Sequence, residues 1–318
     1  MSDQRQHGFR VIFAFALVYV FWGSTYLGIA IGVEHIPPLL MTGTRFFVAG
    51  LLMLAWCGMT GRKVRVSFME GVRLGIIGAL LLTFANPILA HAEEVVPTGL
   101  AALIVSMTPL WFLLIDTWIF RGDRISRRGV GGLLLGIAGI VVLLWPKLRE
   151  MSSNPLDRRV LLYALTLPAA SFTWALGSAL SKRWQEGIDA FSATGWQMSI
   201  AGALNLTLAY ALKEPAHAQW TARGIGAIAY LVVFGSWVGY SAYIWLLQHV
   251  PMPKVATYAY VNPVVAVLLG WLVLHETVDV YILLGSAIIV GAVALVTSAK
   301  IKSKGPELQM APVEGTGD

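Results

Sequence analysis

Charged residues are scarce in this 318-residue chain. Asp, Glu, Lys and Arg make up 13% of it, hydrophobic residues make up 57%, and the mean hydropathy is +0.71. This composition excludes an ordinary water-soluble domain. The single cysteine, Cys57, excludes an intramolecular disulfide and a multi-cysteine metal cluster.

Signatures of an enzyme or of a nucleotide site are also missing. The string His91-Ala-Glu93 has no following P-C-x-x-C, and His275-Glu276 lacks the second histidine of H-E-x-x-H. No phosphate loop or nucleotide fingerprint is present, so nothing in the chain supports ATP as an energy source. We therefore expect a protein that is not an enzyme and that needs no metal and no cofactor.

Apolar residues instead form long blocks between short charged segments. An α-helix that rises 1.5 Å per residue needs about 20 residues to cross a hydrocarbon core of about 30 Å. The blocks lack the alternation and the roughly 10-residue length of membrane-barrel strands. The sequence predicts an all-α membrane protein with ten transmembrane helices, within residues 11–33, 37–61, 74–92, 95–115, 129–146, 160–181, 190–212, 224–253, 255–275 and 280–299.

The distribution of Lys and Arg predicts the orientation, because basic loops tend to stay in the cytoplasm. With a cytoplasmic N-terminus, 16 of the 23 Lys and Arg lie on the cytoplasmic side, and the basic loop 147–159 is the exception. We expect a multi-pass protein of the cytoplasmic (inner) membrane with both termini cytoplasmic, a short tail at 1–10 and a disordered tail at 300–318. This asymmetry accounts for the net charge of +6 without a nucleic-acid partner.

The chain contains an internal duplication. Trp22 and Trp174 differ by 152 residues, and Pro109 and Pro263 differ by 154. An odd number of spans makes the second unit enter the membrane from the opposite side, and such inverted repeats form the central site of many secondary transporters. The predicted units are 11–146 and 160–299, joined by 147–159.

Five segments carry a family resemblance: WGSTY (22–26), PPLLMTGTRFFVAG (37–50), GLAALIVSMTPL (99–110), SFTWALGS (171–178) and YAYVNPVVAVLLG (258–270). Through them the chain resembles tandem EamA domains of the drug/metabolite transporter superfamily, from about Val11 to Ala299. The resemblance implies ten helices in two inverted halves around a central cavity, and export of small metabolites or drugs. It implies no particular substrate.

Aromatic and amide residues recur at helical spacing in several blocks. Tyr19, Trp22 and Tyr26, for example, share one face of the first block. Such side chains can bind an amphipathic or cationic solute, and they serve equally well in helix packing, so the sequence leaves both roles open. The predicted cavity residues are Tyr19, Trp22, Tyr26, Asn86, Thr108, Trp174, Trp237, Tyr240, Tyr258 and Asn262.

Two prolines and three ionisable residues are further candidates. Pro109 and Pro263 lie at matched positions inside apolar blocks, where a proline frees a carbonyl and kinks a helix, and we predict that they act as hinges. Arg45, His91 and Asp116 are coupling candidates, because an ionisable group in a membrane is costly, by about 2.5 kcal/mol or more for the arginine. The structural alternatives are an Arg45 that pairs with a helix end or snorkels towards Glu93 or Glu94, a hydrogen-bonded His91 and an interfacial ion pair of Asp116.

Together these features predict a secondary transporter that exports a small organic metabolite, such as an amino acid or a related compound, or a drug. Its partners are this solute and the lipid bilayer. The few buried charges argue against a phosphorylated or polyanionic substrate. A channel or a lipid scramblase on the same fold is the alternative, and a membrane-embedded enzyme is less favoured.

Overall fold

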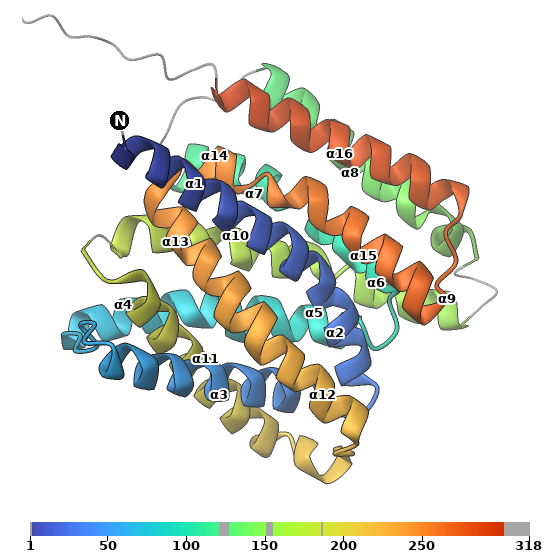
Figure 1. Cartoon of the computed structure of the whole chain (residues 1–318). Coiled ribbons are helices and arrows are strands. Elements are labelled where there is room, and N and C mark those ends of the chain that lie inside the picture. Colours follow the sequence, from blue (N-terminus) through green and yellow to red (C-terminus); the bar gives the residue numbers. More distant parts are fainter. Residues whose placement is uncertain (1, 121–126, 151–154, 186, 302–318) are drawn as a thin grey trace, which may run out of the picture.

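The computed structural model describes residues 2–120, 127–150, 155–185 and 187–301 (Figure 1). Every regular element in these ranges is a helix, and they contain no strand, which confirms the predicted all-α class. The predicted tail at 300–318 lies outside the described residues except for its first two, and residues 151–154 of the predicted loop 147–159 also lie outside them.

In the first half of the chain, π-helical segments interrupt two helices near their middles and follow a third. The elements, in chain order, are α1 (Ser2–Leu17), η1 (Val18–Trp22), α2 (Gly23–Val33), α3 (Pro38–Met59), α4 (Phe68–Gly78), η2 (Ala79–Ala85), α5 (Asn86–Ala92), α6 (Thr98–Val105), α7 (Thr108–Leu114), η3 (Ile115–Ile119) and α8 (Arg127–Glu150).

The second half is also helical throughout its regular elements. Its elements are α9 (Pro155–Ala164), α10 (Leu167–Trp184), α11 (Ala190–Ala211), the 3₁₀-helix η4 (Glu214–His217), α12 (Ala222–Tyr230), the π-helical η5 (Leu231–Tyr240), α13 (Ser241–His249), α14 (Met252–Val255), α15 (Tyr258–Leu274) and α16 (Val280–Ile301).

Seven helices among the described residues are long and apolar enough to cross a membrane. They are His7–Val33, Pro38–Met59, Phe68–Ala92, Thr98–Ile119, Arg127–Pro146, Arg158–Trp184 and Ala222–His249, and Val261–Leu274 and Val280–Ala292 are shorter apolar helices. The helix α11 is long enough to cross a membrane but is not among these, and polar Ser, Thr, Gln and Asn residues interrupt its apolar sequence. The count of ten spans therefore stays a prediction.

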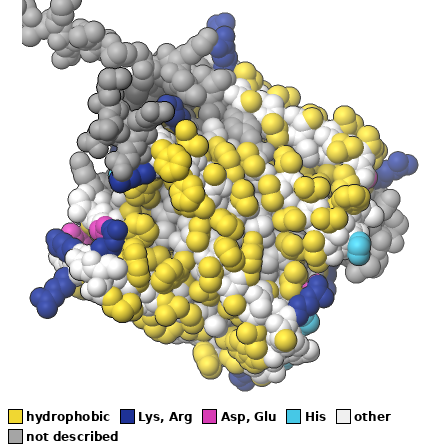
Figure 2. Space-filling model, in the orientation of Figure 1, with side chains coloured by type: hydrophobic (Ala, Val, Ile, Leu, Met, Phe, Trp, Pro, Cys, Tyr) yellow, Lys and Arg dark blue, Asp and Glu magenta, His cyan; other side chains and the backbone are white. Residues whose placement is uncertain are grey.

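Figure 2 shows hydrophobic side chains across the middle of one face and Lys and Arg towards its edges, as a bilayer requires.

The packing of the helices follows the duplication. The helices α3 and α11 occupy corresponding places in the two halves and pack against each other, as do α8 with α16 and α6 with α15. Figure 1 shows α3 beside α11 and α16 beside α8. In addition, α2 packs on α12, and its counterpart α10 packs on α4. Exchange of the two halves thus maps the first three contacts onto themselves and the last two onto each other.

Small residues let α3 and α11 approach closely. A Cβ atom added to Gly202 would lie 2.6 Å from Cα of Phe47, and one added to Gly43 would lie 2.8 Å from N of Leu206. Gly50 and Gly202 are related by the repeat shift of 152 residues. Close approach of this kind is how apolar helices gain packing energy in a membrane, where lipid removes the hydrophobic drive for their association.

Helix breaks accompany the prolines. Ser106 and Met107 separate α6 from α7, and Pro109 lies in the first turn of α7, where its missing N–H is tolerated. The corresponding proline, Pro263, lies inside α15, and the break before that helix falls earlier, at Ala256 and Thr257. The two halves therefore interrupt their corresponding helices at different distances from the matched prolines.

Candidate functional site: a central aromatic cavity

A cavity of about 80 Å³ lies between the two halves of the chain. Elements of both repeats contribute to its wall, among them η1, α2, α3 and η2 of the first and α10, η5 and α15 of the second. Seven of the ten predicted cavity residues line it: Trp22, Tyr26, Asn86, Trp174, Tyr240, Tyr258 and Asn262.

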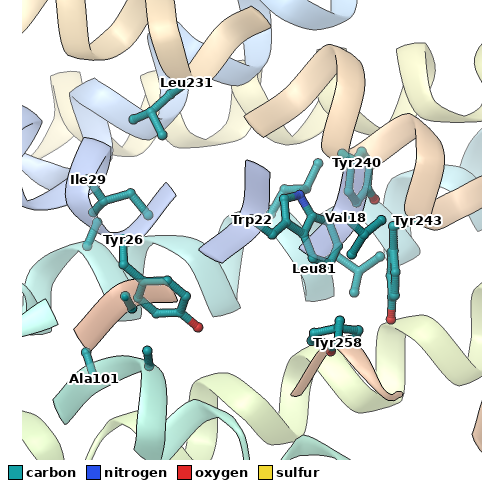
Figure 3. Close-up of a cluster of buried hydrophobic side chains, with 14 of the residues drawn as sticks. Val18, Trp22, Tyr26, Ile29, Leu81, Ala101, Leu231, Tyr240, Tyr243 and Tyr258 are labelled. Atoms are coloured by element: carbon teal, nitrogen blue, oxygen red, sulfur yellow. The ribbon is translucent and has the colours of Figure 1, made fainter. Parts of the chain in front are cut away.

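Trp22, in the wall of this cavity, is the centre of an aromatic cluster (Figure 3). Its ring meets Trp174 and Tyr258 edge to face, with centroid distances of 5.3 and 5.5 Å, and it lies 4.7 Å from the ring of Tyr243. Edge-to-face pairs of this kind are favourable beyond the area that they bury. The Nε1–H of Trp22 donates to the carbonyl of Gly235 at 3.1 Å. The repeat-related Trp22 and Trp174 thus meet across the interface of the halves.

Hydrogen bonds to residues behind the wall position the tyrosines. Tyr240 donates its hydroxyl proton to Oε1 of Gln197 on α11, and the hydroxyl of Tyr243 lies 2.6 Å from Oγ of Ser178 on α10. Tyr243 was not predicted, although its spacing of three residues from Tyr240 places both on one helix face. These buried bonds keep the aromatic layer rigid.

Arg45 lines the cavity from α3 and is only 4% exposed. Its Nε–H donates to Oγ of Ser236 at 3.0 Å, and its guanidinium carbon lies 4.7 Å from the ring centroid of Phe46. Its Nη1 has no hydrogen-bond partner among the described residues. Arg45 also forms no salt bridge with any of them, so the predicted alternative of a pairing with Glu93 or Glu94 is absent.

Two further residues of the same wall carry a buried polar atom without a partner in the described part of the chain. Nε1 of Trp174 is a donor, and Oδ1 of Asn262 is an acceptor. Buried polar atoms are almost always hydrogen-bonded in proteins. Counting Nη1 of Arg45, three such atoms belong to residues of one cavity wall.

Three predicted cavity residues do not line the cavity. The hydroxyl of Tyr19 lies 2.6 Å from Oγ1 of Thr257, and the Nε1–H of Trp237 donates to the carbonyl of Ala49 at 2.9 Å. Thr108 is fully buried and donates to the carbonyl of Val105 at 2.7 Å. The bonds of Tyr19 and Trp237 join elements of the two halves, whereas that of Thr108 stays within the turn between α6 and α7.

The other candidates occupy different places. Pro109 and Pro263 are buried in α7 and α15, outside the cavity wall. His91 is exposed at the end of α5, where its Nδ1 lies 3.7 Å from a carboxylate oxygen of Glu94 and its ring stacks on Tyr163. Asp116 is half-buried in η3. Of the three ionisable candidates, only Arg45 lines the cavity.

Glu93 is an acid whose burial the sequence did not predict. It follows α5, is 6% exposed, and neither carboxylate oxygen has a hydrogen-bond partner among the described residues. Burial raises the pKa of Glu93 well above its ordinary value, and the neighbouring Glu276 raises it further. Glu276 itself accepts hydrogen bonds from N and Oγ1 of Thr98, at 2.7 and 3.0 Å. The described residues contain no cluster of three or more His, Cys, Asp or Glu fit for a metal ion.

Similarity to known proteins identifies the family of this chain. The profile of the EamA-like transporter family matches residues 9–145 and 161–298, which is most of the chain and once in each half. The chain belongs to the EamA-like transporter family. Family members are transporters and not enzymes, which confirms the prediction that this protein is not an enzyme.

Individual relatives agree with this assignment. The chain is 36% identical over 293 residues to YedA, an uncharacterized inner membrane transporter of Escherichia coli strain K12, covering 92% of this chain and 91% of the relative. It is 29% identical over 180 residues to a probable amino-acid metabolite efflux pump of Salmonella typhimurium, covering 56% of this chain and 54% of that one. A solved crystal structure, 22% identical, superposes with a TM-score of 0.67 over 92% of this chain and 99% of its own.

The family and the helices together define the broad class. The E. coli relative is an inner membrane transporter, and seven helices of this chain are able to cross a membrane. The protein is therefore a multi-pass inner membrane protein of a transporter family.

Proposed function

We propose that this protein is a secondary transporter that exports small organic metabolites, such as amino acids or related compounds, or drugs by alternating access. The proposal includes ten membrane spans in two inverted repeats and both termini in the cytoplasm. The excess of Lys and Arg on that side supports the orientation.

The observation that carries this proposal is the central cavity with its three buried polar atoms that lack partners. Both repeats contribute one or more of these atoms: Arg45 in the first, and Trp174 and Asn262 in the second. A site shared by two repeats is the arrangement from which secondary transporters alternate access, because rocking of one repeat against the other opens the site to either side. Buried polar atoms without a partner in the described part of the chain also occur away from the cavity, at Ser181 and Gln185 for example. The proposal therefore rests on the position of these three atoms in one wall that both repeats share.

The dimensions and chemistry of the wall favour a small solute. The cavity volume of about 80 Å³ is well below the roughly 300–1,000 Å³ of a drug-sized site. Rings of Trp22, Trp174 and Tyr258 offer apolar contact, while donors and an acceptor offer hydrogen bonds. The Salmonella relative, a probable amino-acid metabolite efflux pump, supports the same class of solute. A larger drug requires a wider conformation of the same site.

The interrupted helices support movement around the cavity. π-Helical segments recur at functional sites because their looser hydrogen bonding adapts the helix locally. In this chain η1, η2 and η5 each contribute residues to the cavity wall. The prolines of α7 and α15 leave further backbone groups outside the regular helical pattern. These features supply places where the spans bend between two access states.

Counterflow in proteoliposomes tests the proposal. Vesicles that contain the full chain are preloaded with a mixed pool of amino acids and cationic drugs, and exchange is read by mass spectrometry. We expect saturable exchange of a few compounds that is lost in Trp22→Ala and kept in Trp118→Ala, because Trp118 is 71% exposed and lies outside the cavity. Leakage of the whole pool without saturation indicates a channel, and lack of any exchange refutes the carrier.

A further inference from the structure

The guanidinium of Arg45 is a buried positive charge without a counter-charge. It lies on α3, and eight residues of helix from Pro38 place it about 10 Å along the helix axis from the start of that span. Among the described residues no carboxylate pairs with it, and only its Nε–H has a hydrogen-bond acceptor. Arg45 lines the central cavity, so a solute bound there lies next to this unpaired charge.

The surroundings hold the guanidinium in place instead of neutralising it. Ser236 accepts from Nε, and the ring of Phe46 lies under the guanidinium carbon at 4.7 Å. Gly235 leaves room for the group, since a Cβ atom at that position would lie 2.6 Å from Nη2. An arginine fixed on one edge, with Nη1 unbonded, is preorganised to accept an anion with little further loss of side-chain freedom.

An isolated cation in an apolar environment is costly, and proteins compensate such charges by pairing them. Neighbouring atoms indicate what the missing partner carries. Oδ1 of Asn262 is an acceptor without a partner among the described residues of the same small cavity. Nε1 of Trp174 is a second donor there, close to the hydroxyls of Tyr243 and Tyr258 but without a hydrogen bond of good geometry to either. One cation and one neutral donor match a monovalent planar anion, and the acceptor matches a hydroxyl or an amine on the same molecule.

We infer that Arg45 is a specificity-determining residue that binds the carboxylate of the transported solute, so that α-amino or α-hydroxy acids are substrates and their uncharged amides are not. This inference rests on the proposed function and narrows it, because a cationic drug without a carboxylate brings a positive charge next to Arg45 and no anion to pair with it. A phosphate ester, with up to two negative charges, finds only one cation in the cavity wall. Carboxylate therefore fits the charge and the size of the cavity best.

The test compares matched pools in counterflow with the full-length protein in proteoliposomes. One pool contains α-amino and α-hydroxy acids, and the other contains the corresponding amides, which keep the side chain and the amine or hydroxyl. We expect exchange of members of the acid pool and of none in the amide pool. Arg45→Gln raises the half-saturating concentration of each exchanged acid about 10- to 100-fold, the range expected for a lost charged hydrogen bond.

Control variants separate binding from folding. Arg62→Gln makes the same substitution at an arginine that pairs with Asp189 outside the cavity, and we expect it to exchange acids as the wild type does. If Arg45→Gln does not elute as a monodisperse protein, Arg45→Lys keeps the charge but not the planar fork, and we expect it to restore part of the acid preference. Ser236→Ala frees Nε and is expected to weaken acid exchange less than Arg45→Gln.

Each outcome decides the inference. Exchange of amides at rates equal to those of acids, or unchanged half-saturation in Arg45→Gln, overturns it and leaves the proposed transport intact. Competition by inorganic phosphate or chloride alone that matches competition by the acids shows a general anion site and also overturns it. Lack of exchange with either pool refutes the proposed function, and the role of Arg45 with it.

Discussion

The contact between α3 and α11 offers a prediction whose sign follows from geometry. Gly202→Ala adds one methyl group, and its carbon would lie 2.6 Å from Cα of Phe47. That neighbour is backbone, so it cannot rotate away, and the two helices must separate by about 1 Å to reach normal packing distances. Overpacking of this kind costs about 1–3 kcal/mol.

A matched control isolates this cost. Gly226→Ala, on α12, places its methyl where no atom lies within 4 Å. Alanine is better than glycine in a helix by about 0.5–1 kcal/mol, and both variants receive this gain. We therefore expect Gly226→Ala to keep or raise stability and Gly202→Ala to lower it.

Thermal unfolding in detergent, followed by tryptophan fluorescence, measures the two effects. A loss of about 1 kcal/mol lowers the melting temperature by roughly 2–4 °C in proteins of 150–250 residues, and a somewhat smaller change is expected for this longer chain. The melting temperature of Gly202→Ala should fall below those of the wild type and of Gly226→Ala. A Gly202→Ala protein that melts at or above the wild-type temperature would refute the close approach of α3 and α11.

Three further variants test other parts of the account. Because burial raises the pKa of Glu93, the folded protein holds a proton that the unfolded chain releases near pH 4.3, and the melting temperature should fall as the pH rises from 5 to 8. In Glu93→Gln this fall should be smaller. An equal dependence of the melting temperature on pH in the two proteins contradicts the burial of the acid. Glu214 accepts from N of Leu40 at 2.7 Å at the start of α3, so Glu214→Ala should cost about 0.5–2 kcal/mol in thermal unfolding, and an unchanged melting temperature excludes this capping role. Pro263→Ala should lower the counterflow rate more than expression, whereas an unchanged rate removes the hinge.

The helical class and the central residues followed from patterns that a sequence displays directly. Long apolar blocks have few alternatives to membrane helices, and the repeat shift paired Trp22 with Trp174, which the structure brings into contact. Seven predicted residues line the cavity because aromatic and amide side chains in the middle of such blocks face other helices more readily than lipid.

A local change in helix geometry explains why Tyr19 and Trp237 do not line the cavity. A regular helix puts Tyr19, Trp22 and Tyr26 on one face, but the π-helical η1, Val18–Trp22, changes the number of residues per turn at that point. Tyr19 therefore meets Thr257 while the other two reach the cavity. Trp237 lies within η5 and is displaced in the same way.

Long-range packing determines the remaining features. Nothing local to Arg45 shows that its partner is Ser236, 191 residues away, or that no acid reaches it. Glu93 follows an apolar block and precedes Glu94, a pattern typical of an exposed loop, yet the packing of the two halves buries it. Burial of single charged residues depends on contacts that one sequence does not reveal.

The central claim is that the cavity between the repeats opens in turn to both sides of the membrane. Ala170 lines it and is 3% exposed, so a cysteine there, in a Cys57→Ser background, reports access with a membrane-impermeant thiol reagent. We expect the reagent to modify Cys at position 170 when it is added to either side separately, and each modification to stop counterflow. Modification from one side only contradicts alternating access, and modification from neither side contradicts a solute site in this cavity.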